Sequence, residues 1–236
     1  MAMTGRDGEG PRLLVGSLAF EGMDQLDLTG PFEVLSRMPG AACRVYAKSA
    51  GIVRDVKGLG IIADAALAEA PQLDVLHVPG GFGQEALMDD AEVLDWVARQ
   101  AAGARFVLSV CTGALICGAA GLLKGKRATT HWAVHHLLPL FGANAEPARV
   151  VVDGSLVSTA GVTAGIDGAL TLAALACGED SARSIQLAMQ YAPDPPFDSG
   201  TLESAPPQIV EGARAAFADI TRRREATARR IGLLGH

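Results

Sequence analysis

Two patterns of apolar residues alternate along this chain. Continuous apolar runs of the length of buried strands are separated by segments in which apolar residues recur every three or four positions, as on one helix face. Strands are predicted at Arg12–Phe20, Cys43–Ser49, two short strands within Ile52–Ala63, Leu73–Val78, Arg105–Val110, Arg149–Val152 and Leu156–Thr159, the last two joined by the turn Asp153-Gly154. Helices are predicted at Pro31–Met38, Gly83–Met88, Ala91–Ala102, Thr112–Ala120, His131–Phe141, Gly165–Cys177, Ser181–Tyr191 and in a long segment after Pro207.

This alternation, with strands that are almost continuously apolar, is typical of an α/β fold. It predicts a mostly parallel central sheet with helices on both faces. In such sheets the functional site lies outside the carboxyl ends of the strands. Three loops are expected at that edge, and they carry Asp27, Gly80-Gly81 and Cys111. We therefore expect these residues to meet in space.

Composition narrows the class of protein. The chain has 236 residues, of which 49% are hydrophobic and 19% charged, and its formal net charge is −6. We expect a disordered tail over residues 1–11 and a single domain over residues 12–236. The negative charge argues against general nucleic-acid binding. The arginines after Asp219 alternate with acids and alanines at helical spacing, which predicts a solvated helix face for Arg222, Arg223, Arg224, Arg229 and Arg230.

The four cysteines (Cys43, Cys111, Cys117 and Cys177) lie far apart, in neither a disulfide framework nor a metal-binding spacing. The sequence shows no signal segment and no apolar run long enough to span a membrane. We therefore expect a cytoplasmic protein with free thiols.

Cys111 follows an apolar strand and precedes Thr112-Gly113. The spacing of Ser109, Cys111 and Gly113 is that of a nucleophile elbow, in which a sharp strand-to-helix turn exposes one side chain. A helix N-terminus at this point would favour the thiolate form. The alternative is a buried core cysteine, because free cysteine is often fully buried.

Asp27 lies between two leucines just before the predicted helix. Beside a thiolate its pKa would rise, and the protonated carboxyl could act as a general acid. The alternative is a carboxylate that serves only the helix N-terminus. Glu21, the other acid near this loop, is expected to be exposed.

Gly80 and Gly81 offer backbone N–H groups that could stabilise developing negative charge, with the N–H of Thr112 as a second donor. The alternative is a turn that needs a positive φ. His131 and His135 have a spacing that can bind zinc, but Trp132-Ala133 stands where a metalloprotease motif has its glutamate, so we expect no metal. His131 is instead expected to support the site or begin a helix. Thr112, not histidine, follows Cys111, so no adjacent imidazole base is present.

These motifs resemble the ThiJ/PfpI superfamily, which is class I glutamine-amidotransferase-like. The likeness runs from about Leu13 through the helix after Pro207 and rests on Leu26-Asp27-Leu28-Thr29-Gly30-Pro31, Val78-Pro79-Gly80-Gly81, Ser109-Val110-Cys111-Thr112-Gly113 and Gly125-Lys126-Arg127-Ala128-Thr129-Thr130-His131-Trp132. Within the superfamily the chain most resembles the members that hydrate isonitriles.

The resemblance implies a flavodoxin-like sheet, a homodimer, no metal or organic cofactor, and a small-molecule isonitrile substrate. It implies Cys111 as nucleophile, Asp27 as general acid and base, and Thr112 where peptidases of the family carry histidine. A peptidase needs an imidazole to protonate its leaving amine, whereas isonitrile hydration has no leaving amine. The alternatives are another small-molecule enzyme, such as a cofactor-independent glyoxalase or an amide hydrolase, and a non-enzymatic redox- or ligand-sensing module.

Overall fold

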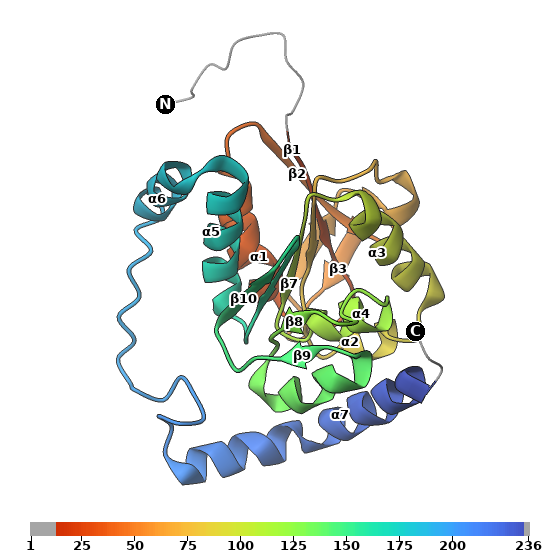
Figure 1. Cartoon of the computed structure of the whole chain (residues 1–236), viewed down its shortest axis with the longest axis vertical. Helices are drawn as coiled ribbons and strands as arrows, with labels where there is room; N and C mark the ends of the chain where they lie inside the picture. The colour runs from red at the N-terminus through yellow and green to blue at the C-terminus, as the bar shows by residue number, and fades with distance from the viewer. Residues whose placement is uncertain (1–12, 234–236) are drawn as a thin grey trace.

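The computed structural model describes residues 13–233, so the tail predicted for residues 1–11 lies outside the described residues. Its main feature is a seven-stranded sheet with the strand order β10-β11-β7-β6-β1-β2-β5. Every neighbouring pair is parallel except β10 and β11, which form an antiparallel hairpin. Helices lie on both sides of this sheet (Figure 1). The predicted α/β class is confirmed.

The strands of this sheet are β1 (Leu13–Leu18), β2 (Ala41–Ala47), β5 (Ala65–Ala66), β6 (Val75–Val78), β7 (Phe106–Val110), β10 (Val150–Asp153) and β11 (Leu156–Thr159). Two small pairs stand apart from it: antiparallel β3 (Gly51–Arg54) with β4 (Gly60–Ala63), and parallel β8 (Arg127–Ala128) with β9 (Asn144–Ala145). The β3–β4 pair was predicted, whereas the two-residue strands β5, β8 and β9 were not.

The helices are α1 (Gln25–Leu35), η1 (Leu67–Glu69), α2 (Gln84–Leu87), α3 (Ala91–Gly103), α4 (Gly113–Ala119), η2 (Trp132–Phe141), α5 (Ala164–Cys177), α6 (Glu179–Ala188) and α7 (Pro207–Leu233). The predicted helix at His131–Phe141 forms as the 3-10 helix η2, which contains Pro139. A proline there removes one backbone donor from the α-helical ladder.

Two buried hydrophobic clusters flank the sheet because successive strand residues point to opposite faces. In β7, Val107 belongs to the cluster that contains α3 and α4, whereas Leu108 and Val110 belong to the cluster that contains α1 and α5. The strands are therefore covered on both faces, which explains why their sequences are almost continuously apolar.

Helix α1 begins earlier than the sequence predicted. The prediction placed Pro31 in the first turn of a helix ending at Met38, but α1 begins at Gln25 and Pro31 lies in its interior. Asp24 caps this helix, because its side chain accepts a hydrogen bond from the N–H of Leu26 at 3.0 Å. The prediction is wrong because a proline in the interior was read as a helix start. The consequence is that Asp27 lies inside a helix and not before one.

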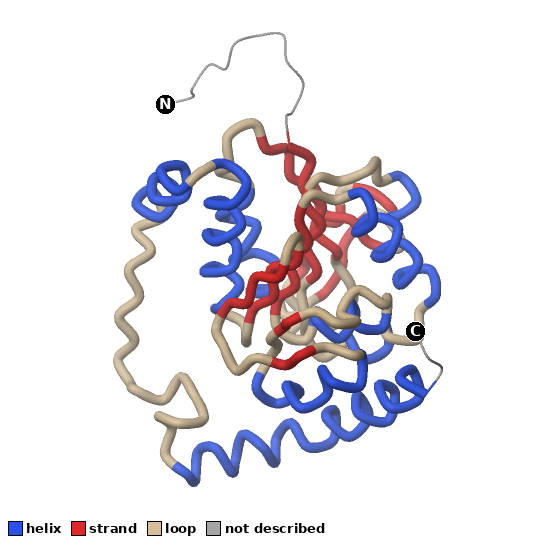
Figure 2. Tube along the Cα trace, in the orientation of Figure 1, coloured by secondary structure: helices blue, strands red, loops and turns tan. Residues whose placement is uncertain are grey.

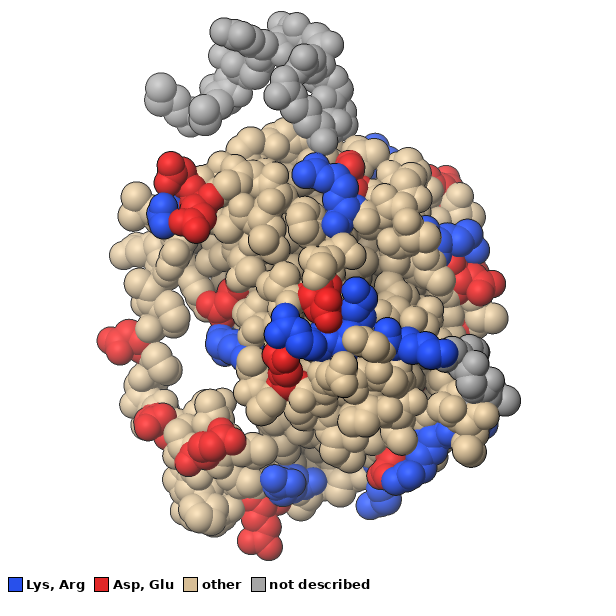
Figure 3. Space-filling view, in the orientation of Figure 1, with Lys and Arg blue, Asp and Glu red and all other residues tan. Residues whose placement is uncertain are grey.

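Helix α7 is reached through a long loop after α6 and packs against η2, α2 and α4 (Figure 2). No helix within residues 13–233 is both long and apolar enough to cross a membrane. On the face shown in Figure 3, the charged side chains form small groups, several of which contain both acidic and basic residues, among uncharged surface.

Candidate active site

Cys111 lies at the sharp turn between β7 and α4. Its φ is +55°, a left-handed conformation that is uncommon for residues other than glycine. The turn is held on both sides, because the N–H of Cys111 donates to the carbonyl of Ala160 at 3.0 Å and Thr130 Oγ1 donates to the carbonyl of Cys111 at 2.6 Å. A Cβ on Gly113 would lie 2.2 Å from the carbonyl oxygen of Val78, so the turn needs a glycine there. The backbone geometry is that of an elbow. The side chain is not exposed as expected, because Cys111 is buried within the hydrophobic cluster that contains α1 and α5.

Asp27 is fully buried in α1, and its carboxyl lies close enough to the side chain of Cys111 for each group to affect the pKa of the other. Its Oδ1 has no hydrogen-bond partner within the described structure. Its Oδ2 accepts a hydrogen bond from the N–H of Gly80 at 3.0 Å. Burial, with a smaller contribution from the charge of Asp24, raises the pKa of Asp27 to about 7. Asp24 caps the helix, whereas Asp27 is the acidic residue of its first turn, so the alternative of a carboxylate that serves the helix N-terminus stays open.

Gly80 brings the three predicted loops together. A Cβ on this residue would lie 2.6 Å from both the N and the Oγ1 of Thr112 and 2.9 Å from Asp27 Oδ2. A side chain at this position would therefore separate Asp27 from the elbow. The prediction that the loops of Asp27, Gly80-Gly81 and Cys111 meet is confirmed.

The amides of Gly80 and Gly81 are not free, contrary to the expectation of oxyanion donors. The N–H of Gly80 donates to Asp27, and the N–H of Gly81 donates to Thr112 Oγ1 at 3.0 Å. The hydroxyl of Thr112 in turn donates to the carbonyl of Gly81 at 3.2 Å. Both glycine amides therefore hold the carboxyl and hydroxyl groups in place.

The backbone N–H groups of Thr112 and Val162 lie near the sulfur of Cys111, and each acts to lower its pKa. The Thr112 donor was predicted, but the Val162 donor was not. Burial and the charge of Asp27 nevertheless raise the pKa of Cys111 well above its ordinary value. The Thr112 amide at the helix N-terminus favours the thiolate as expected, but the desolvation of a side chain that is 6% exposed outweighs it.

His77, which sequence reasoning missed, holds the backbone of Asp27. Pro31 has no N–H to bind the carbonyl of Asp27 four residues earlier, and that carbonyl accepts a hydrogen bond from His77 Nε2 at 3.1 Å. Since Nε2 carries the proton, Nδ1 accepts a hydrogen bond from Ser17 Oγ at 2.9 Å. Burial lowers the pKa of His77 to about 4, so the ring is neutral. The sequence signal that could have identified His77 is its position within the otherwise apolar strand β6.

Arg224, predicted to lie on a solvated helix face, is buried against the site. It is 3% exposed, and its Nη2 donates to the carbonyl of Gly81 at 2.6 Å. Three of the other arginines do face solvent beside acids of the same helix: Arg222 and Arg223 contact Asp219, and Arg229 contacts Glu225. The exposed Arg230 reaches across to Asp89. The signal for Arg224 was its position on the apolar stripe of the helix, with Ile220, Thr227, Ala228 and Ile231 at helical spacing and no acid among them.

His131 begins η2, and its Nδ1 accepts a hydrogen bond from the N–H of Ala133 at 3.2 Å. The expectation that it begins a helix is confirmed. Burial, and then the charge of Arg224, lower the pKa of His131 to about 4. Its ring contacts Trp132 and Phe217, and Phe217 stacks on Phe82. Among residues 13–233, no group of three or more His, Cys, Asp or Glu side chains is arranged to hold a metal ion.

Comparisons with known proteins identify the family of this chain. The model of the DJ-1/PfpI family matches residues 14–175. The chain belongs to the DJ-1/PfpI family. Among relatives in this family, the isonitrile hydratase of Pseudomonas putida is 50% identical over 202 residues, which are 86% of this chain and 89% of that protein.

Two solved structures have a fold similar to that of this chain. A ThiJ/PfpI family protein from Pseudomonas syringae has a TM-score of 0.90 and 38% identity and covers 97% of both chains. A DJ-1 superfamily protein from Salmonella typhimurium has a TM-score of 0.70 and 26% identity and covers 76% of this chain but 99% of its own. Helix α7 lies beyond residue 175, where the family model ends.

Proposed function

We propose that this protein hydrates isonitriles to N-substituted formamides, a hydro-lyase reaction, with Cys111 as nucleophile and Asp27 as general acid and base. The observation that carries the proposal is the buried Asp27 carboxyl beside the elbow of Cys111, with Oδ2 held by Gly80 and Oδ1 without a hydrogen-bond partner in the described structure. The 50% identity to the isonitrile hydratase of Pseudomonas putida supports the choice of substrate class.

The two side chains share a proton in the range where the enzyme would work. The pKa of Asp27 is about 7 and that of Cys111 lies well above its ordinary value, so above about pH 7 the pair holds one proton. This proton can lie on the sulfur or on the carboxyl. The reactive form is the one with a thiolate at Cys111 and a neutral carboxyl at Asp27.

In the first step the thiolate attacks the terminal carbon of the isonitrile and forms a C–S bond. Asp27 gives its proton to the same carbon, which produces a thioimidate on Cys111 and a carboxylate at Asp27. The proximity of the two buried side chains supports this assignment, because an acid beside the sulfur can reach the carbon that the sulfur attacks.

In the second step water adds to the thioimidate carbon. One proton of the water goes to the nitrogen and the other returns to Asp27, while the C–S bond breaks and regenerates the thiolate. The sum is one isonitrile and one water converted to one formamide, with no net change in the protein. Thr112 has a hydroxyl that is fixed by Gly81, and it orients the sulfur or the water.

Thr112 also separates this proposal from the hydrolase alternative. A hydroxyl does not shuttle protons near neutral pH as an imidazole does, so cleavage of peptides or simple amides is not expected. The nearby His131 does not substitute, because its pKa is lowered to about 4 and its Nδ1 is already bonded to Ala133.

The test is to incubate the purified protein separately with an aryl isonitrile, with methylglyoxal and with a peptide substrate. We expect the corresponding formamide from the first, measured by liquid chromatography, and no turnover of the others. Turnover of methylglyoxal without turnover of isonitrile would instead establish the glyoxalase alternative. Peptide cleavage that disappears in Cys111→Ala would establish the hydrolase alternative.

We further propose that the protein works as a homodimer in the cytoplasm. The apolar side chains on the β3–β4 pair support an interface, because Ile52 is 65% exposed and Ile62 is 68% exposed. Light scattering coupled to size-exclusion chromatography measures the oligomeric state, and a monomeric mass at micromolar concentration would contradict the dimer.

A further inference from the structure

We propose that Arg224 is a positioning residue of the active site: its guanidinium fixes the carbonyl of Gly81, and its positive charge favours the thiolate form of Cys111. This inference rests on the proposed role of Cys111 as nucleophile. It assigns a function to α7, which lies beyond the part of the chain that the family model matches.

The first support is the place where the guanidinium is bound. Nη2 of Arg224 donates to the carbonyl of Gly81, the same oxygen that accepts the hydroxyl of Thr112. The N–H of Gly81 is bonded to that hydroxyl as well. Arg224 therefore holds the peptide group that orients Thr112, the residue next to Cys111.

The second support is the cost of burying this charge. Arg224 is 3% exposed, its Nε has no hydrogen-bond partner within the described structure, and its guanidinium carbon lies 6.0 Å from the centre of the Phe82 ring. Burial lowers the pKa of Arg224 to about 10. A buried cation without a carboxylate bonded to it is costly unless a negative charge forms nearby.

The charged groups around Arg224 indicate where this negative charge forms. Negative charge on Cys111 raises the pKa of Arg224, and Glu85 on α2 does so as well. Arg223 and the ring of His131 are the other titratable groups that interact with it. Glu85 is engaged by the hydroxyl of Thr227 at 3.3 Å. The guanidinium is close to Cys111, because the Gly81 carbonyl to which it donates also accepts the hydroxyl of Thr112, the next residue in the chain. A positive charge at this place favours the thiolate of Cys111.

The experiment measures thiolate formation without using hydratase turnover. Asp27→Asn removes the coupled proton, so the pKa of Cys111 can be measured in that background from the pH dependence of alkylation by iodoacetamide, followed on the Cys111 peptide by mass spectrometry. Adding Arg224→Met removes the charge but keeps an unbranched apolar side chain. We expect alkylation at a pH below both midpoints to slow by about tenfold or more, which corresponds to a rise of one unit in the thiol pKa.

Two further variants distinguish charge from packing. Arg224→Lys retains the positive charge, and its alkylation rate should stay within about threefold of the parent rate. Arg222→Met is the matched control on the same helix, because Arg222 is exposed and pairs with Asp219, and it should leave the rate unchanged. Thermal unfolding verifies that each variant is folded.

An unchanged thiol pKa in folded Arg224→Met would overturn the proposal. If that variant does not fold, Asp27→Asn decides alone: its thiol must titrate at or below the ordinary cysteine value of about 8.5, and a higher value overturns the proposal. If the wild-type protein does not turn over isonitriles but the alkylation rates shift as expected, the proposed function is refuted and the role of Arg224 stands.

Discussion

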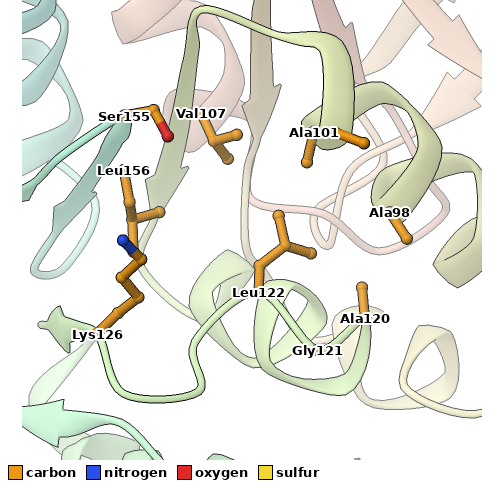
Figure 4. Close-up of a pocket in the computed structure, with 10 residues that line it drawn as sticks. Ala98, Ala101, Val107, Ala120, Gly121, Leu122, Lys126, Ser155 and Leu156 are labelled. Carbon is orange, nitrogen blue, oxygen red and sulfur yellow. The ribbon is translucent and has the colours of Figure 1, made fainter.

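The two ends of strand β7 show what distinguishes a reactive site from a hollow. At the carboxyl end, buried polar groups from α1, α4, α7 and the Gly80-Gly81 loop converge on Cys111. At the amino end, Val107 borders a hollow of about 240 Å³ lined largely by alanine and leucine (Figure 4). Its one cation, Lys126, lies 3.6 Å from Asp153. This hollow has no convergent polar groups, so the hydrogen-bonded end of the strand indicates the site better than the presence of a hollow does.

Removal of the proposed nucleophile is the change with the largest expected effect at the carboxyl end. Cys111→Ala should abolish isonitrile hydration, because no other thiol lies beside Asp27, while the fold remains. Turnover and thermal unfolding measure the two effects. Cys117→Ala is the matched control, since Cys117 is buried in α4, in the hydrophobic cluster on the other face of the sheet from Cys111, and activity should be largely kept. Substantial turnover by folded Cys111→Ala would rule out covalent catalysis.

Removing the acid should have the next largest effect. Asp27→Asn keeps the shape of the side chain but not its proton, and general acid–base steps contribute about 10²–10⁴-fold. We expect a loss of kcat in that range. Asp27→Glu should be milder but still impaired, because its carboxyl moves by one methylene. A rate near that of the wild type in Asp27→Asn would leave the carboxyl with no part in proton transfer.

The pH dependence of kcat/KM tests the role of Asp27 in a second way. The raised pKa of Asp27 means that the pair holds two protons below about pH 7 and one proton above it. The wild-type kcat/KM should therefore rise with pH up to about 7 and then level. Asp27→Asn should lose this limb, with its residual rate rising only as the Cys111 thiol ionises. A wild-type rate that is highest in acid would contradict the one-proton active form.

Thr112→Val should have a smaller effect. The change removes the hydroxyl that bonds both the N–H and the carbonyl of Gly81 but keeps the backbone N–H that faces the sulfur. Hydrogen bonds of this kind contribute about 1 kcal/mol each, so a loss on the order of tenfold in turnover is expected, without unfolding. A loss as large as that in Cys111→Ala would mean that Thr112 takes part in the chemistry directly.

The smallest effect is expected at the amino end. Ala101→Leu adds apolar volume to the hollow without touching Cys111 or its partners. Turnover should stay within about twofold of the wild type, as for independent sites far apart. A severalfold loss in a variant of unchanged thermal stability would show that the hollow contributes to function and that the comparison of the two ends is wrong.

Much of the fold and part of the site could be predicted from the sequence. The apolar strands and the Ser109, Cys111 and Gly113 spacing depend on local backbone preferences, and these predicted the sheet and the elbow. Pro31 misled the prediction of α1, because the lost backbone hydrogen bond is replaced by one from the distant His77.

The burial of Arg224 and the raised pKa of Cys111 follow from how separate elements pack. Charge spacing along α7 looks similar for Arg222 and Arg224 until the packed face of the helix is known. The donor at Val162 reaches the sulfur only through the loop after β11. Such features depend on contacts that are remote in sequence, which local patterns do not encode.

At the left-handed backbone position of Cys111, stability of the fold favours glycine, whereas the proposed activity requires cysteine. A side chain in this conformation costs about 1–2 kcal/mol, and glycine adopts it without that strain. Random mutagenesis followed by selection for thermal resistance alone should therefore accept glycine at this position, whereas selection for turnover should always retain cysteine. The fold is therefore less stable than it could be at this position, because the strained backbone of Cys111 keeps its sulfur beside the Asp27 carboxyl.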